Sequence, residues 1–253
     1  MKNFKYYLMA LASIAMLNAC SDDDPVPGNP TMDFQAEPSS ALFGDSLPFT
    51  IKASDADVPL STLKAQLYFS DEMVSETVIR TKVSGQEYNG KIYVPYLANI
   101  PNGTATLKFI LQNINFTITE KSYDVALSRP DFPYLTLISG DQEYRMEKVA
   151  ANQYSVTSEF AQKVKGYIKA PKVGANGNEI NFGWSNGAIT QGTSSEITFS
   201  SLSAGKYSIS FNTLTYAAAP FVKLLLNGSE MEMVDDNHYS IDLNLKQGDN
   251  ITA

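Results

Sequence analysis

Residues 63–69 read Leu-Lys-Ala-Gln-Leu-Tyr-Phe, and this short segment decides the fold class. Apolar residues occupy the odd-numbered positions, while the even-numbered positions carry Lys, Gln and Tyr. A period of two is typical of a β-strand with one face in the core and one face in solvent. The same period recurs at residues 49–53, 105–111 and 123–127. No segment carries a helical stripe of three turns, so the sequence predicts an all-β protein.

About seven short strands are expected before Arg129, and turn signals separate them. The expected strands are residues 32–36, 49–53, 63–69, 74–81, 91–94, 105–111 and 123–127. The turn signals are Phe43-Gly44-Asp45, Ser84-Gly85, Asn89-Gly90 and Pro101-Asn102-Gly103. Seven short strands in about 100 residues are typical of an immunoglobulin-like β-sandwich, which we place at residues 31–129.

A second sandwich is expected at residues 130–220. Pro130 and Pro133 interrupt strand pairing and mark the boundary between the two modules. The strands expected after it are residues 134–138, 144–148, 153–157, 166–170, 179–184, 196–200 and 206–212, with glycine-rich turns at 173–177 and 185–187.

An internal similarity suggests a third module. Residues 152–156 (Asn-Gln-Tyr-Ser-Val) recur 85 residues later as Asn-His-Tyr-Ser-Ile at 237–241. We therefore expect residues 221–253 to begin a third β module in a sequence that is a truncated record of a longer protein. The alternative is that these residues form a closing hairpin of the second sandwich.

The first residues have the pattern of a lipoprotein leader. A basic start precedes an apolar run from Tyr6 to Leu17, which is too short to span a bilayer but long enough for a signal peptide. The run ends in Leu17-Asn18-Ala19-Cys20, which resembles the bacterial lipobox. We expect residues 1–19 to be a signal peptide and Cys20 to be the lipidation site. The alternative is a secreted soluble protein with one spare thiol.

Residues 20–30 are expected to form an acidic, proline-rich linker. Ser21, Asp22, Asp23 and Asp24 follow the cysteine directly. An acidic stretch at this place resembles the surface-export signal of Bacteroidetes lipoproteins, which directs them to the outer face of the outer membrane. The alternative is a solvated acidic spacer. Pro25 to Pro30 then predict a semi-extended stalk.

Composition excludes several functions. The chain carries 19 basic and 27 acidic side chains, for a net charge of -8, and loss of the leader with Lys2 and Lys5 makes this -10. An acidic chain without a basic face does not suit a nucleic-acid partner. One Cys and one His exclude a disulfide framework and a Cys/His zinc site. We expect no metal and no cofactor.

No catalytic motif is present, and the chain is expected not to be an enzyme. The lone histidine, His238, is interpreted as a surface or edge residue. Asp45, Asp55 and Asp57 offer oxygen ligands for Ca²⁺, but they lack a complete calcium-loop spacing, and a solvated turn is the favoured interpretation.

Aromatic residues supply the candidate binding site. The chain holds 14 Tyr, 13 Phe and one Trp, and aromatic faces pack against the C–H faces of sugars. Trp184 stands at a strand end before Ser185-Asn186-Gly187, where it suits a glycan platform, although the core Trp of a sandwich is the favoured interpretation. Tyr88, Tyr93 and Tyr96, near the expected Asn89-Gly90 turn, are further glycan-binding candidates.

Four segments carry a resemblance to a known family, namely residues 17–24, 43–47, 57–64 and 221–247. Together they resemble the SusE/SusF-like surface glycan-binding lipoproteins. Such a protein would be lipid-anchored in the outer membrane, exposed at the cell surface, and would capture oligosaccharide or polysaccharide for a TonB-dependent transporter of the SusC/SusD type. The resemblance places glycan binding toward the C-terminal modules. Asp45-Ser46-Leu47 also resembles the Bacteroidetes O-glycosylation sequon.

Two other functions stay open from the sequence. One is a structural or adhesive surface lipoprotein whose immunoglobulin-like domains are spacers. The other is a glycosidase or an accessory chain of one, because paired carboxylates meet only in the folded protein.

Overall fold

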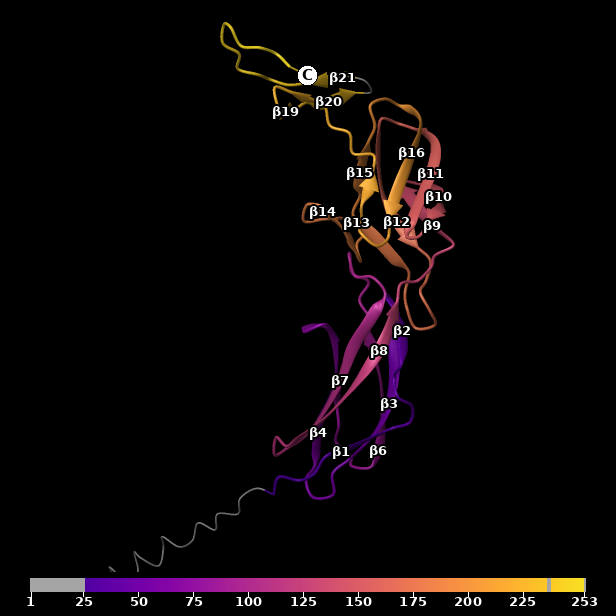
Figure 1. Cartoon of the computed structure of the whole chain (residues 1–253), viewed down its shortest axis with the longest axis vertical. Coiled ribbons are helices and arrows are strands. Elements are labelled where there is room, and N and C mark those ends of the chain that lie inside the picture. The colour runs from indigo at the N-terminus through magenta and orange to yellow at the C-terminus, as the bar shows by residue number, and fades with distance from the viewer. Residues whose placement is uncertain (1–25, 236–237, 253) are drawn as a thin grey trace, which may run out of the picture.

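The computed structural model describes residues 26–235 and 238–252 (Figure 1), and the predicted lipidation residue Cys20 and the acidic run 21–24 lie outside them. The described residues are all-β and form tandem β-sandwich domains, as the sequence predicts. No stretch of helix that could cross a bilayer occurs among them.

The first domain contains eight strands in two sheets. They are β1 (Thr31–Phe34), β2 (Ser40–Leu42), β3 (Ser46–Ser54), β4 (Leu60–Phe69), β5 (Glu72–Arg80), β6 (Gln86–Tyr93), β7 (Gly103–Asn113) and β8 (Ile118–Ser128). One sheet has the order β1-β3-β6 and the other the order β2-β8-β7-β4-β5, with β2 parallel to β8. This is an immunoglobulin-like arrangement.

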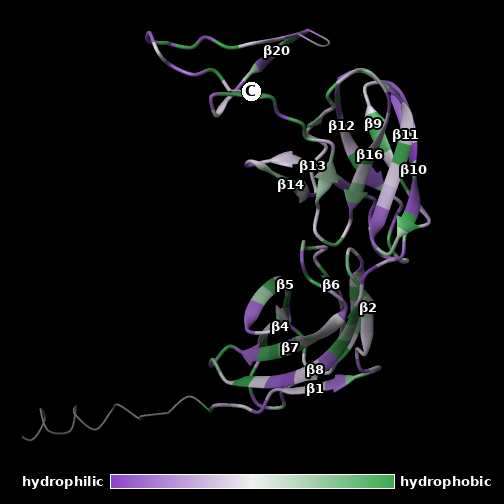
Figure 2. Cartoon of the chain, turned by 45° about the horizontal axis from the view of Figure 1, so that its top comes forward, coloured by the Kyte–Doolittle hydropathy of each residue, from purple (hydrophilic) through white to green (hydrophobic). Residues whose placement is uncertain are grey.

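The core of the first domain follows from the alternation in the sequence. Leu63, Ala65 and Leu67 of β4 are completely buried and face the other sheet, while the residues between them stay partly exposed. Phe109 of β7 stands at the centre, with edge-on contacts to Phe49 at 5.1 Å between ring centroids. Figure 2 shows hydrophobic and hydrophilic residues alternating along β7 and β8.

One expected turn is a strand. Asn89-Gly90, a common hairpin sequence, lies inside β6, and Gly90 pairs with Phe49 of β3. A Cβ atom at position 90 would lie 2.4 Å from Cζ of Phe49 and 2.7 Å from Cδ1 of Ile79. The glycine is therefore present to make room for a core ring, and the prediction of a turn here was wrong.

The second domain is one curled sheet of nine strands. They are β9 (Tyr134–Ser139), β10 (Gln142–Ala150), β11 (Gln153–Phe160), β12 (Lys163–Ala170), β13 (Ile180–Ser185), β14 (Ala188–Gln191), β15 (Ile197–Ser200), β16 (Gly205–Asn212) and β17 (Ala218–Ala219). The order is β14-β13-β12-β9-β10-β11-β16-β17, and β15 pairs with β12. The turns expected at 173–177 and 185–187 are both present.

Curling brings β15, which branches from β12, to the segment that follows β17. Ser200 of β15 donates its N–H to the carbonyl of Pro220, and Val222 donates its N–H to the carbonyl of Ser200, both at 3.0 Å. The segment after β17 thus lies beside β15. Beyond it, two small hairpins are formed by β18 (Leu225–Leu226) with β19 (Ser229–Glu230), and by β20 (Glu232–Asp235) with β21 (His238–Ser240). Whether they begin a third module stays a prediction.

The two sandwiches meet at an aromatic joint. Tyr96, after β6, stacks against Tyr216, which lies between β16 and β17, with 6.5 Å between ring centroids. Arg129 of the linker stands over the Tyr96 ring at 4.2 Å and donates to the carbonyl of Ile100 at 2.7 Å and to that of Thr213. Buried apolar side chains form one continuous cluster through both domains.

The Gly90 contact gives a first prediction. Gly90→Ala is expected to lower the free energy of unfolding by about 1–3 kcal/mol, because the added methyl group overlaps the buried Phe49 ring. The measurement is urea unfolding. Gly103→Ala is the matched control, since its Cβ would meet nothing closer than 4.0 Å, and its effect should stay within about 0.5 kcal/mol. Equal losses in the two variants would contradict this account.

Two buried tyrosines, Tyr154 and Tyr216, lower the free energy of unfolding at alkaline pH. Burial raises the pKa of Tyr154 to about 12, and burial also raises the pKa of Tyr216 above its ordinary value. Tyrosines in the unfolded chain ionise near about pH 10, so above that pH the unfolded chain binds fewer protons than the folded one. The contribution of both groups is complete below about pH 10 and is lost as the pH rises through their folded pKa values.

We therefore expect the urea midpoint to fall steeply between about pH 10 and pH 12. Tyr154→Phe removes the hydrogen bond to the carbonyl of Phe132 (2.8 Å) and should unfold more readily at neutral pH, but its midpoint should fall less over the alkaline range. A variant with an unchanged alkaline slope would exclude Tyr154 as a source of the effect.

Candidate functional site

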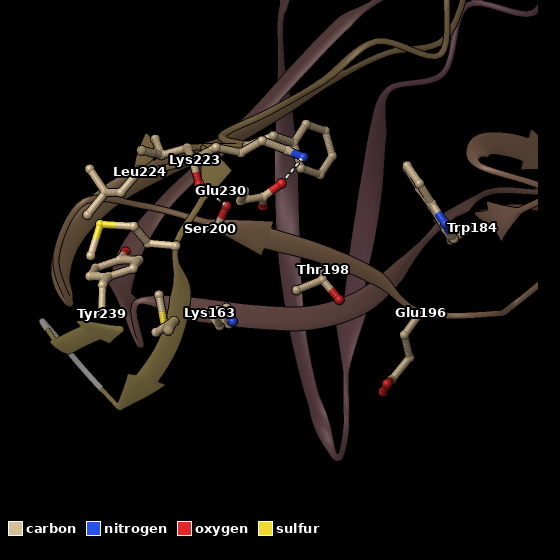
Figure 3. Close-up of a pocket in the computed structure, with 13 residues that line it drawn as sticks. Lys163, Trp184, Glu196, Thr198, Ser200, Lys223, Leu224, Glu230 and Tyr239 are labelled. Atoms are coloured by element: carbon tan, nitrogen blue, oxygen red, sulfur yellow. Dashed lines mark hydrogen bonds and ion pairs between the residues drawn. The ribbon is translucent and has the colours of Figure 1, made fainter. Parts of the chain in front are cut away.

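A pocket of about 530 Å³ lies between the second sandwich and the C-terminal hairpins (Figure 3). Its floor is formed by residues of β12, β13 and β15, and its other wall by residues 221–224, β19, β20 and β21. The residues that line it are Lys163, Trp184, Glu196, Thr198, Ser200, Phe221, Val222, Lys223, Leu224, Glu230, Met231, Met233 and Tyr239.

Strand alternation sets the polar floor. Ile197 and Phe199 of β15 are completely buried, so Thr198 and Ser200 point the other way, into the pocket. Their hydroxyl groups stand on a rigid strand that pairs with β12 through residues 163–166. The site therefore presents hydrogen-bonding groups on a fixed surface.

Trp184 provides an open aromatic face. It shares the register of Ile180 and Phe182 in β13, both of which are buried, yet 43% of Trp184 is exposed. The Trp184 ring lines the pocket and is only partly covered by other residues. Of the two interpretations the sequence left open, the structure excludes the core Trp.

Phe221 joins Trp184 at the pocket. The two ring centroids are 6.5 Å apart with an angle of 54° between the planes, and 41% of Phe221 is exposed. Phe221 also stacks on buried Phe199 at 5.6 Å, which fixes its ring. The sequence analysis did not select Phe221, although it is the only Phe, Tyr or Trp between Tyr216 and Tyr239.

The charges around the pocket balance. Lys223 Nζ lies 2.6 Å from Glu230 Oε2 and forms an ion pair on the C-terminal wall. Lys163 and Glu196, on the sandwich side, make no ion pair within the described part of the chain. With two lysines and two glutamates, the lining suits a neutral ligand with many hydroxyl groups better than a strongly charged one.

A buried glutamine ties the C-terminal wall to the sandwich. Gln162, which precedes β12, is completely buried and donates from Nε2 to the carbonyl of Leu202 at 3.0 Å and to the hydroxyl of Tyr239 at 2.5 Å. Because β21 carries Tyr239, this contact holds the second hairpin against the sandwich and closes one side of the pocket.

The three tyrosine candidates do not join Trp184. Tyr88 bonds through its hydroxyl to the backbone of Val83, at the far end of the first sandwich. Tyr93, at the end of β6, is 39% exposed, and burial of part of its ring raises its pKa. Tyr96 is completely buried in the joint between the domains, so its ring is closed to ligands and its selection as a glycan-binding residue was wrong.

Asp45, Asp55 and Asp57, the possible calcium ligands, do not belong to a cluster of metal ligands in the described part of the chain. Burial acts to raise the pKa of Asp55, but hydrogen bonds from Asn113 and from the backbone N–H groups of Asp57 and Val58 outweigh it and lower that pKa. Asp55 is thus a buried turn residue and not a solvated one. No group of three or more potential metal ligands occurs in residues 26–235 and 238–252.

Comparison with family models covers nearly the whole chain. Residues 124–253, more than half of the sequence, match the model described as Domain of unknown function (DUF5125). The chain belongs to the DUF5125 family. Residues 1–120 match a second model, Domain of unknown function (DUF5016). No curated protein matches the sequence. The DUF5125 region contains every residue that lines the Trp184 pocket.

Proposed function

We propose that this protein is a cell-surface lipoprotein that binds a glycan in the Trp184 pocket. The observation that carries the proposal is an exposed Trp184 beside an exposed Phe221, in a pocket whose rigid floor carries hydroxyl and charged groups. Binding sites for small molecules are concave, mostly apolar, and supplied with a few well-placed polar groups.

The pocket matches the two kinds of surface on a sugar. A pyranose ring has C–H faces, which pack on aromatic rings such as Trp184 and Phe221. Its rim carries hydroxyl groups, which donate to Glu196 and accept from Lys163. The Thr198 hydroxyl is both a donor and an acceptor, whereas the Ser200 hydroxyl donates to the carbonyl of Val222 at 2.9 Å and offers the sugar an acceptor. The balanced charge of the lining favours a neutral glycan.

We propose that the protein captures its ligand and does not hydrolyse it. Glycoside hydrolysis needs two carboxyl groups that flank the scissile bond. The two carboxylates of the pocket stand on opposite walls, and Glu230 is already paired with Lys223 at 2.6 Å. This arrangement supports binding and offers no reason to assign a general acid.

Membrane anchoring completes the proposed role. Lipidation of Cys20 and the acidic run Ser21–Asp24 would place the protein on the outer face of the outer membrane, as a partner of a SusC/SusD-type transporter. The strands β12, β15 and β21, which line the pocket, lie far from the end at which the described chain begins (Figure 1). Anchored copies would raise the local glycan concentration through weak multivalent contacts.

The pocket is tested by Trp184→Ala. The variant should bind its polysaccharide about thirtyfold more weakly or worse, since loss of a central aromatic contact costs roughly 2 kcal/mol or more. Its thermal midpoint should change little, because Trp184 is 43% exposed. Affinity electrophoresis of the mature chain against a panel of neutral and acidic polysaccharides measures the first effect, and calorimetric unfolding the second.

Leu202→Ala is the matched control, because Leu202 is 61% exposed in the same domain and does not line the pocket. If no polysaccharide in the panel retains the mature chain, the proposal is refuted and the structural or adhesive role is favoured. Full binding by the Trp184→Ala variant would refute the assignment of the pocket.

Anchoring is tested by Cys20→Ala. We expect this variant to be missing from the outer-membrane fraction and to keep its leader, because the only thiol in the chain is the proposed acceptor of the lipid. Cell fractionation and mass measurement of the purified protein provide the readout. Release of a cleaved, unacylated wild-type protein into the medium would contradict the proposal. Asp22→Asn and Asp23→Asn are the control variants, and both should keep the lipid.

A further inference from the structure

The hairpin between β7 and β8 ends in an exposed apolar tip. Ile114, Phe116 and Ile118 are exposed to 53%, 79% and 51%, respectively. We call these three residues the apolar tip. Phe116 has the largest exposed fraction among the large hydrophobic residues of the described chain. Adjacent exposed apolar side chains of this size mark a surface that contacts another apolar phase or partner.

The backbone holds Phe116 in place. Its φ is +64°, a conformation that non-glycine residues seldom adopt. Asn113 fixes it, because Oδ1 of Asn113 accepts from the N–H groups of Asn115 and Thr117 at 3.0 Å, and the carbonyl of Asn113 accepts from the N–H of Phe116 at 3.2 Å. An unfavourable conformation that surrounding bonds maintain points to a function for the residue it displays.

The same hairpin holds the first described residues of the chain. Asn115 Nδ2 donates to the carbonyl of Val26 and Asn113 Nδ2 to that of Pro27, both at 2.7 Å. Thr119 Oγ1 donates to the carbonyl of Pro30 at 2.5 Å. Val26 is itself 60% exposed and extends the apolar surface. The leader side of the chain therefore leaves the domain beside the apolar tip.

Chain length limits how far this end can stand from a lipid anchor. Six residue steps separate Cys20 from Val26, and a fully extended chain covers at most about 3.6 Å per step, or about 22 Å in all. A lipid on Cys20 sits in the bilayer, so the apolar tip stays within a short distance of the membrane surface. The strands that line the pocket, β12, β15 and β21 among them, lie toward the other end of the molecule (Figure 1).

We propose that the apolar tip inserts into the interface of the membrane that anchors Cys20. The occupant of this surface is the boundary between lipid headgroups and acyl chains, where Phe and Ile side chains replace water contacts with hydrocarbon. Insertion adds a second attachment to the lipid anchor and directs the pocket outward. The proposal rests on the proposed lipidation of Cys20.

The chain offers a clean optical test, because Trp184 is its only tryptophan and Cys20 its only thiol. In a Trp184→Phe background, Phe116→Trp places a single fluorophore at the apolar tip, and Leu202→Trp places one at an exposed control site of the second domain. The chain from Cys20 onward is coupled through its thiol to a maleimide lipid in phosphatidylcholine vesicles. The acyl chains carry bromine near the headgroup, which quenches tryptophan on contact.

The fluorophore at position 116 should be quenched about twofold or more over that at position 202, and its emission should shift to shorter wavelength, since interfacial insertion reaches roughly 5–10 Å. Adding Ile114→Ser and Ile118→Ser to the reporter should remove most of this difference. Equal quenching at positions 116 and 202, with far-ultraviolet circular dichroism unchanged in both variants, would overturn the proposal. The coupling is chemical, so this outcome is distinct from a failure of cellular lipidation, which Cys20→Ala tests, or of glycan binding.

Discussion

The contacts of the Arg129 guanidinium hold the two sandwiches in one arrangement. Arg129 donates to the carbonyls of Leu97 and Ile100, at 2.9 and 2.7 Å, in the first domain and to that of Thr213 in the second. Its plane also stands 4.2 Å from the centre of the Tyr96 ring. Only a guanidinium combines several directed donors with a flat face that stacks on an aromatic ring, so lysine would not replace it. Arg129 acts together with the stacking of Tyr96 on Tyr216 and the N–H of Asn99, which donates to the carbonyl of Leu214 at 2.7 Å.

The second constraint is the curl of the nine-stranded sheet. Because Ser200 of β15 pairs with the chain at Pro220 and Val222, Phe221 comes to lie on Phe199 and beside Trp184. A flat sheet would leave these aromatic residues far apart. The pocket is thus a consequence of sheet closure. The same closure places the C-terminal hairpins opposite Thr198 and Ser200, which form the polar floor of the pocket. The proposed binding site and the closure of the sheet therefore depend on the same contacts.

The two-residue period predicted the long strands correctly, but it did not show where a tertiary contact gives a residue another role. The alternation at residues 63–69 predicted β4 and its buried face correctly. Asn89-Gly90 has the sequence of a hairpin turn, but Gly90 lies in a strand, where the absence of a side chain leaves room for the ring of Phe49 in the neighbouring strand. The short strands β2, β14 and β17 carry too few residues to show a period and were not expected. The pairing of β2 with β8 and the contact of Gly90 with Phe49 depend on partners that are distant in the sequence.

The sequence by itself determined the all-β class, the tandem sandwiches and the aromatic supply, because a period of two and the turn residues are local properties of the chain. The tertiary structure alone decided which aromatic residues stay open. Tyr96 is closed by the meeting of two domains, whereas 43% of Trp184 stays exposed at the pocket. Exposure depends on what packs against a side chain from elsewhere in the fold, and no local pattern of residues records that contact.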